Sequence, residues 1–122
     1  MAHSLVVIED EPGVAEMLRD AFEANAFPVA VLDHLQGTED LPPDLHPDVF
    51  VIDLMLPDLD GVEVAQLLRE QGFRSTPMIG MSASRVLTEQ AARSGVFDEV
   101  FRKPFDLHML LDRVRRHRPR VA

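Results

Sequence analysis

Three carboxylate residues stand directly after short apolar runs of the sequence. Glu9 and Asp10 follow the run 5–8, and Asp53 follows the run 49–52. Carboxylates held close together repel one another, so a cation is needed to keep all three ionised at neutral pH. Mg²⁺ suits such a site because it prefers hard oxygen ligands and commonly bridges carboxylates to a phosphoryl group. These residues are therefore candidate magnesium ligands.

Asp53 could also act as a nucleophile that accepts a phosphoryl group as an acyl phosphate. Ser82 follows the apolar run 78–81, and Lys103 lies just beyond the run 100–101. A hydroxyl and an ammonium group can bind phosphoryl oxygens and neutralise their charge during transfer. The candidate chemistry is thus phosphoryl transfer to Asp53, with Ser82 and Lys103 assisting.

For these side chains to meet, the apolar runs must be neighbouring strands of one sheet. Each run is too short for a helix and is unbroken rather than alternating, which is typical of buried parallel strands. The runs cover residues 5–8, 29–32, 49–52, 78–81 and 100–101. Strands that alternate with helices predict a doubly wound α/β sheet, whose ligand site lies beyond the carboxyl ends of the strands.

Helical segments separate most of these runs. Apolar side chains share one helical face in each of three segments, at 14, 18, 21 and 22, at 64, 67 and 68, and at 107, 110, 111 and 114. Pro12 suits a first helical turn, Asp106 suits an N-cap, and Gly72 and Gly95 suit helix ends. Between residues 33 and 48 the prolines leave room for only a short helix or an irregular loop.

The composition limits the class of protein. A chain of 122 residues suits one domain, 1–122, and its formal net charge of −9 disfavours direct binding to nucleic acid or to an anionic membrane. The absence of cysteine excludes disulfides and thiolate metal sites. No stretch has the pattern of a secretory signal or the length of a membrane span. We expect a cytoplasmic domain whose partner is a protein.

Four segments resemble the signatures of response-regulator receiver domains, the chemotaxis-regulator-like switches of bacterial two-component phosphorelay signalling. They are residues 7–12, 51–61, 81–83 and 102–105, and the resemblance spans almost the whole chain. It implies a flavodoxin-like (βα)5 fold with five parallel strands in the order 2-1-3-4-5.

The resemblance also assigns roles to single residues. Asp53 is similar to the phosphoacceptor, Glu9 and Asp10 to the acidic pair that binds Mg²⁺, and Met55 to the residue whose backbone carbonyl completes the metal shell. Ser82 resembles the switch hydroxyl. The last member, Lys103, resembles the invariant lysine, which a cis peptide bond joins to the following proline.

The function that the resemblance implies is a signalling switch. A histidine kinase or phosphotransfer protein would phosphorylate Asp53, and the domain would catalyse only its own phosphorylation and dephosphorylation while it switches the binding of a downstream protein. A homodimer could form through the last strand and the last two helices. The charged residues available there are Asp98, Glu99, Arg102 and Arg113.

Two alternatives stay open. The first is a receiver-like interaction module that is not phosphorylated, which is suggested by Val100 at the position where the family commonly has an aromatic switch residue. The second is a small phosphatase that uses Asp53 on external substrates and turns over more than one equivalent. The combination of acids, hydroxyl and lysine favours the phosphorylated receiver.

Overall fold

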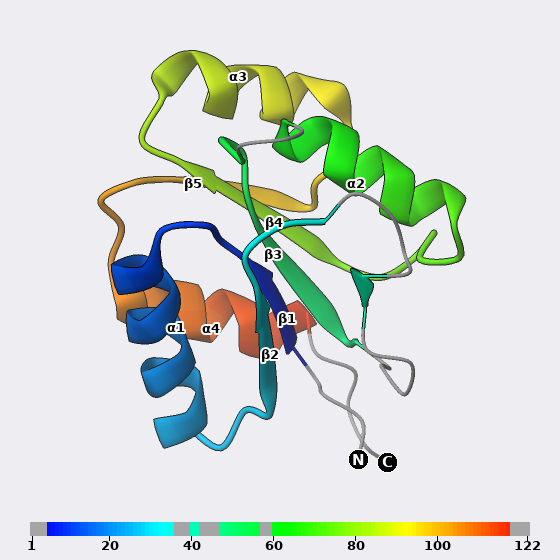
Figure 1. The fold of residues 1–122 in the computed structure, drawn as a ribbon. Coiled ribbons are helices and arrows are strands. Elements are labelled where there is room, and N and C mark those ends of the chain that lie inside the picture. The colour runs from blue at the N-terminus through cyan, green and yellow to red at the C-terminus, as the bar shows by residue number, and fades with distance from the viewer. Residues whose placement is uncertain (1–4, 36–39, 42–46, 57–59, 118–122) are drawn as a thin grey trace.

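A computed structural model describes residues 5–35, 40–41, 47–56 and 60–117 of the chain. The strands are β1 (Leu5–Ile8), β2 (Val29–Leu32), β3 (Val49–Asp53), β4 (Met78–Ser82) and β5 (Glu99–Arg102). The helices within these residues are α1 (Pro12–Ala24), α2 (Gly61–Glu70), α3 (Arg85–Ser94) and α4 (Leu107–His117). The strands pair in parallel in the order β2-β1-β3-β4-β5, which confirms the predicted fold class (Figure 1).

The helices cover both faces of the sheet. In Figure 1, α1 and α4 lie on one face, and α2 and α3 lie on the other. Strands β1, β3 and β4 are buried along their whole length, which explains why their sequences are unbroken apolar runs.

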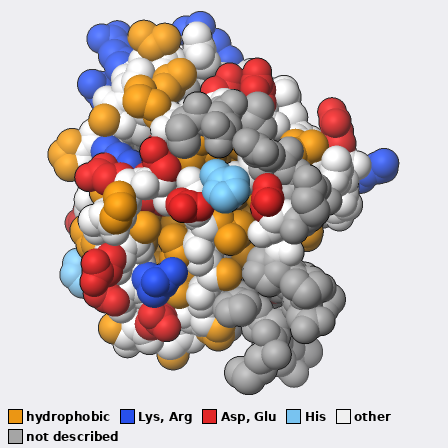
Figure 2. Space-filling view, viewed as in Figure 1, with side chains coloured by type: hydrophobic (Ala, Val, Ile, Leu, Met, Phe, Trp, Pro, Cys, Tyr) orange, Lys and Arg blue, Asp and Glu red, His pale blue; other side chains and the backbone are white. Residues whose placement is uncertain are grey.

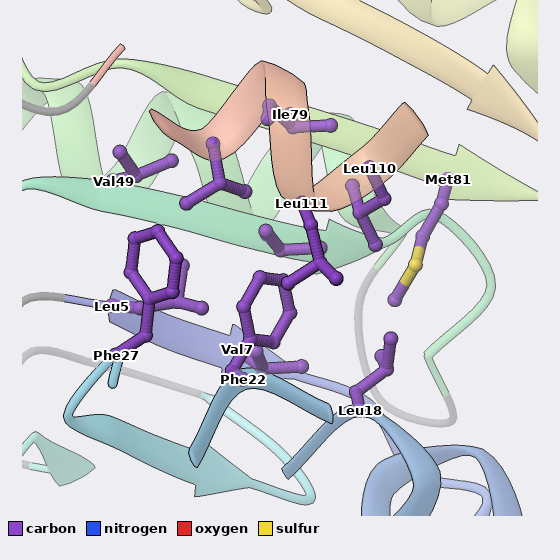
Figure 3. Close-up of a cluster of buried hydrophobic side chains, with 12 residues drawn as sticks. Leu5, Val7, Leu18, Phe22, Phe27, Val49, Ile79, Met81, Leu110 and Leu111 are labelled. Carbon is purple, nitrogen blue, oxygen red and sulfur yellow. The ribbon is translucent and has the colours of Figure 1, made fainter. Parts of the chain in front are cut away.

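Two apolar layers hold the sheet between the helices. Alternate residues of β1 point to opposite layers, so that Leu5 and Val7 belong to one and Val6 and Ile8 to the other. Figure 3 shows the first layer, in which side chains of α1 and α4 meet those of the central strands. The sheet is thus anchored from both sides, and its carboxyl edge can position polar side chains.

The helix boundaries follow local hydrogen bonds. Pro12 is the first residue of α1, as predicted, and Asp60 caps α2 by accepting a 2.8 Å hydrogen bond from the Glu63 N–H. The cap of α3 is Ser84, whose hydroxyl oxygen accepts from the Leu87 N–H at 3.2 Å. Gly95 ends α3 in the left-handed conformation with a φ of 73°.

The N-terminus of α4 is capped as the sequence predicts. Asp106 accepts from the His108 N–H at 2.9 Å just before α4, as expected of an N-cap. Of the described positions between β2 and β3, which are 33–35, 40–41 and 47–48, Asp40 alone is helical, in a 3₁₀ conformation. The rest of that segment lies outside the described residues, so the fifth helix that the (βα)5 expectation includes stays a prediction. Among the described helices, none is long and apolar enough to cross a membrane.

Candidate functional site

Asp53 is the last residue of β3, at the carboxyl edge of the sheet. Its side chain is buried, with 5% of the residue exposed, and Oδ1 accepts a hydrogen bond of 3.1 Å from the Met55 N–H. The following residue, Leu54, donates its N–H to the Met81 carbonyl at 2.8 Å and so extends the pairing of β3 with β4. The first bond therefore orients the Asp53 carboxylate, and the second fixes the backbone that follows it.

Glu9 and Asp10 follow β1, the strand beside β3. The Glu9 N–H donates to the Leu32 carbonyl at 2.9 Å, which places its buried side chain at the sheet edge, whereas Asp10 is exposed. Carboxylate oxygens of Glu9, Asp10 and Asp53 all lie within 4.8 Å of one another. The three residues predicted from the sequence to bind a metal are thus close enough to share one cation.

Lys103 enters the pocket from the end of β5. Its N–H donates to the Ser82 carbonyl at 2.8 Å, and its peptide bond to Pro104 is cis, as predicted. The Nζ atom donates to Glu9 Oε1 at 2.8 Å and lies 3.9 Å from Asp53 Oδ2. The ammonium group therefore bridges two of the three carboxylates, with its closer contact to Glu9.

Ser82 ends β4 and is 1% exposed. Its Oγ accepts from the Ser84 N–H at 3.0 Å, while Ser84 itself caps α3. Because the cap is formed by Ser84, Ser82 has no part in capping, and its hydroxyl hydrogen can still be donated to an oxygen of a ligand.

Burial and repulsion between carboxylates govern the electrostatics of the pocket. Burial raises the pKa of the Asp53 carboxyl to about 7, and its interaction with Glu9 adds to the rise. For Glu9, burial acts in the same direction, but hydrogen bonds from Asp53 and Lys103 hold its pKa below the ordinary value. Near neutral pH the two buried carboxyl groups therefore titrate as a pair and share a proton.

Met55 lies at the mouth of the pocket, with 59% of the residue exposed. Its N–H binds Asp53 Oδ1, so its backbone stays beside the phosphoacceptor candidate. The role of its carbonyl as a metal ligand stays a prediction.

A groove beside the pocket contains residues that sequence analysis missed. It has a volume of about 610 Å³ and lies between α1 and β2, and its lining includes Glu9, Asp10, Arg19 and Asp33. Acidic side chains also gather in the middle of the face shown in Figure 2. The helical spacing from Pro12 to Arg19 could have indicated that this part of α1 faces the acidic pair.

Gly61, the first residue of α2, is a second position that the sequence did not single out. Its N–H donates to the Leu54 carbonyl at 3.0 Å, and a Cβ atom there would lie 2.5 Å from the Leu54 Cα and 2.8 Å from the Asp53 carbonyl oxygen. Only glycine permits this close approach, so Gly61 positions the chain that carries Asp53.

Three of the four charged residues offered for a dimer, Asp98, Glu99 and Arg113, already have partners within the chain. Asp98 contacts Arg69, and Glu99 contacts both Arg113, at 3.4 Å, and His117, at 2.6 Å. Charge pairs between two copies would have to compete with these contacts.

Fold and site together define a doubly wound α/β protein with an acidic site at the carboxyl edge of its sheet. The family model described as the response regulator receiver domain matches residues 5–115. The chain therefore belongs to the receiver domain family of two-component response regulators.

Individual relatives agree with this assignment. The regulatory protein AtoC of Escherichia coli is 36% identical over 108 residues, which are 87% of this chain and 23% of that protein. The DNA-binding response regulator MtrA of Mycolicibacterium smegmatis is 31% identical over 94% of this chain and 50% of its own length. The chain thus spans half or less of these curated relatives.

A solved structure is also similar. The receiver domain of the Francisella response regulator 1452 is 30% identical, with a TM-score of 0.77, and the match covers 94% of this chain and 95% of that one. The similarity extends over the complete (βα) architecture rather than over the pocket alone.

Proposed function

We propose that this receiver domain accepts a phosphoryl group on Asp53 and that the acyl phosphate switches the binding of a partner protein. The observation that carries the proposal is the convergence of a buried carboxylate, two further acids and an ammonium group from three strand ends. The donor is a phosphohistidine of a histidine kinase or phosphotransfer protein. An Asp53 oxygen forms the new P–O bond while the P–N bond to the imidazole breaks.

Lys103 and Ser82 stabilise the product. The Lys103 ammonium, now 3.9 Å from Asp53 Oδ2, turns from Glu9 toward the phosphoryl oxygens, whose added negative charge attracts it. The Ser82 hydroxyl donates to another phosphoryl oxygen, and this contact couples Asp53 to β4 and to the helix that follows it.

The donor set fits Mg²⁺. Glu9, Asp10 and Asp53 would hold the ion, with the Met55 carbonyl as a further ligand. When bound, Mg²⁺ would neutralise phosphoryl oxygens during transfer and keep the phosphodonor in line with Asp53. The raised pKa of Asp53 supports this fit, because a cation would replace the proton that the carboxylates otherwise share.

Residues 1–122 act as one receiver, in the cytoplasm, and its output is a protein contact rather than direct binding of nucleic acid or membrane. The only reactions that it catalyses are its own phosphorylation and dephosphorylation. The acidic net charge of −9 supports a protein partner.

Phosphorylation with a small-molecule donor tests the proposal. The wild-type chain is incubated with acetyl phosphate and Mg²⁺, and intact-mass spectrometry should detect one added phosphoryl group. Asp53→Ala should take up none, whereas Asp112→Asn, a change on the exposed face of α4, should be labelled like the wild type.

Each alternative has its own outcome in this assay. Stoichiometric labelling that persists in Asp53→Ala refutes the assignment of the phosphoacceptor. A wild-type chain that takes no label and binds no Mg²⁺ is the interaction module, and turnover of a phosphomonoester beyond one equivalent identifies a phosphatase.

A further inference from the structure

A second pocket lies at the amino edge of the sheet, where the strands begin, opposite the edge that carries Asp53. This amino-edge pocket has a volume of about 430 Å³. The segment that leads into β3 contributes Pro47 and Asp48, and the turn that joins α2 to β4 contributes Gly72 and residues 74–77. Because β3 and β4 are paired in parallel, the segments that precede them meet at this edge.

Arg69, near the end of α2, fixes the backbone of the turn. Its Nη1 atom donates to the carbonyl oxygens of Phe73, Arg74 and Thr76 at 3.2, 2.9 and 2.6 Å. Its Nη2 atom donates to the Val96 carbonyl at 2.8 Å, so the guanidinium group is itself held from a second side. Three carbonyl groups of one short turn are thus directed at a single cation.

The direction of these carbonyls decides where the neighbouring N–H groups point. In a trans peptide unit, the C=O bond of one residue and the N–H bond of the next point in opposite directions. The turn contains only trans units, since the one cis bond among the described residues joins Lys103 to Pro104. The N–H groups of Arg74 and Ser75 therefore point away from Arg69. Arg69 does not line the amino-edge pocket, so the pocket lies on the side to which these N–H groups point.

The hydrogen-bond donors of this turn have no partner within the part of the chain that the structure describes. No hydrogen bond or ion pair there uses the N–H groups of Arg74 and Ser75, the Arg74 guanidinium group, or the hydroxyls of Ser75 and Thr76. Successive N–H groups that point the same way form a concavity that binds anions. A guanidinium group and two hydroxyls beside them are the donors that phosphate oxygens require.

Asp48 gives the opposite wall of the pocket a different chemistry. Its carboxylate is half-buried and lies across from the donors of the turn. It repels a bare phosphate ion, but it can accept hydrogen bonds from a hydroxyl group. A ligand that carries both a phosphate group and hydroxyl groups therefore satisfies both walls. The net charge of −9 acts mostly from beyond the screening distance of about 10 Å, so the local donors govern binding.

We propose that the amino-edge pocket binds a small phosphate monoester, whose phosphate group is held by Arg74, Ser75 and Thr76 and whose hydroxyl groups are bound by Asp48. The volume of about 430 Å³ is within the range of small-molecule sites. The bound ligand joins the start of β3 to the start of β4 and stabilises the folded domain by mass action. The site is separate from Asp53, and the proposal does not depend on phosphorylation there.

Amide resonances in nuclear magnetic resonance spectra of the full chain test the proposal. The probe is glycerol phosphate, titrated with a chelator present so that no Mg²⁺ can hold a phosphate group at Asp53. We expect a saturable shift of the Arg74 and Ser75 amides, with a Kd of about 1 mM or lower. Inorganic phosphate should bind about tenfold more weakly, because it leaves Asp48 without a donor. Glycerol without phosphate should leave both amides unchanged.

Two matched variants locate the phosphate group. Arg74→Gln should weaken the binding of glycerol phosphate about tenfold or more, because it removes a charged hydrogen-bond donor. Since Arg74 is exposed, this variant should fold like the wild type. The control is Arg93→Gln, which makes the same change at an arginine of α3 whose side chain is 80% exposed, and it should bind glycerol phosphate like the wild type.

A third variant tests the opposite wall. Asp48→Asn removes the charge that repels a phosphate ion, so inorganic phosphate should bind more tightly. The preference for glycerol phosphate over inorganic phosphate should then fall from about tenfold to about threefold or less.

Each result decides a stated part of the proposal. No shift of the Arg74 and Ser75 amides at up to about 10 mM glycerol phosphate overturns it. Equal losses of affinity in Arg74→Gln and Arg93→Gln also overturn it, because they would indicate a general effect of charge. Equal affinities of the wild type for glycerol phosphate and inorganic phosphate overturn the role of Asp48. These results are independent of the labelling of Asp53, so failure here leaves the proposed function standing.

Discussion

Replacing the phosphoacceptor candidate should stabilise the protein in the absence of metal. Asp53→Asn keeps the shape of the side chain, and its amide oxygen can still accept the Met55 N–H. The amide NH₂ can donate to Glu9 in place of the proton that the acid carries. The variant therefore removes a buried carboxylate whose ionisation the fold opposes.

The size of the effect follows from the pKa of Asp53. Each pKa unit corresponds to about 1.4 kcal/mol, so a rise from 3.8 to about 7 sets an upper limit of about 4 kcal/mol. The lowered pKa of Glu9 opposes this effect, because the pair shares one proton. We expect Asp53→Asn to raise the free energy of unfolding by about 2 kcal/mol at pH 8.

The pH dependence has a defined sign. Since the folded state holds the Asp53 proton more tightly than the unfolded chain does, the stability from this group is complete below about pH 4 and is lost as the pH rises through about 7. The gain in Asp53→Asn should accordingly be large at pH 8 and small at pH 5.

Urea denaturation followed by circular dichroism is the suitable assay, because the chain has no tryptophan or tyrosine for intrinsic fluorescence. Asp112→Asn, which removes an exposed acid, should stay within about 0.5 kcal/mol of the wild type at both pH values. A gain in Asp53→Asn that is equal at pH 5 and pH 8, or a loss of stability at pH 8, would refute the reasoning.

Three further changes test the surroundings of the site. Gly61→Ala should lower the free energy of unfolding by about 1–3 kcal/mol and reduce phosphorylation, because the added Cβ would overlap the Leu54 backbone. Urea denaturation would measure the loss of stability, and labelling would measure the loss of phosphorylation. An unchanged free energy of unfolding would contradict this prediction. Arg69→Ala removes hydrogen bonds to four carbonyl groups and should cost about 2–4 kcal/mol in the same denaturation assay, while labelling of the folded protein continues. Lys103→Ala leaves Glu9 without its cation and should slow labelling by acetyl phosphate about 100-fold. A labelling rate within threefold of the wild type would exclude the proposed role of Lys103 in phosphoryl transfer.

Much of the fold followed from the amino-acid sequence. The run predicted at 49–52 is β3 (Val49–Asp53), and the shorter run at 100–101 is the centre of β5 (Glu99–Arg102). Such runs are informative because parallel strands covered on both faces exclude polar side chains along their length. The same rule explains why the first polar residue after each run lies at the carboxyl edge of the sheet, where the candidate site is.

The segment between β2 and β3 was predictable only in part. Its prolines indicated a short helix or a loop, and local signals could not choose between these two structures.

Only the tertiary structure decided how the site residues interact. Lys103 contacts Glu9 more closely than Asp53, and the pKa of Asp53 is raised while that of Glu9 is lowered. Both features depend on distances between strands that are far apart in the chain and on the burial of each group. The hydrogen bonds from Arg69 to the turn before β4 are likewise invisible in the sequence, where no motif indicates them. Sequence determined which groups gather at the edge of the sheet, because strand ends are a local property, while their charge states and contacts arise from the packing of the whole fold.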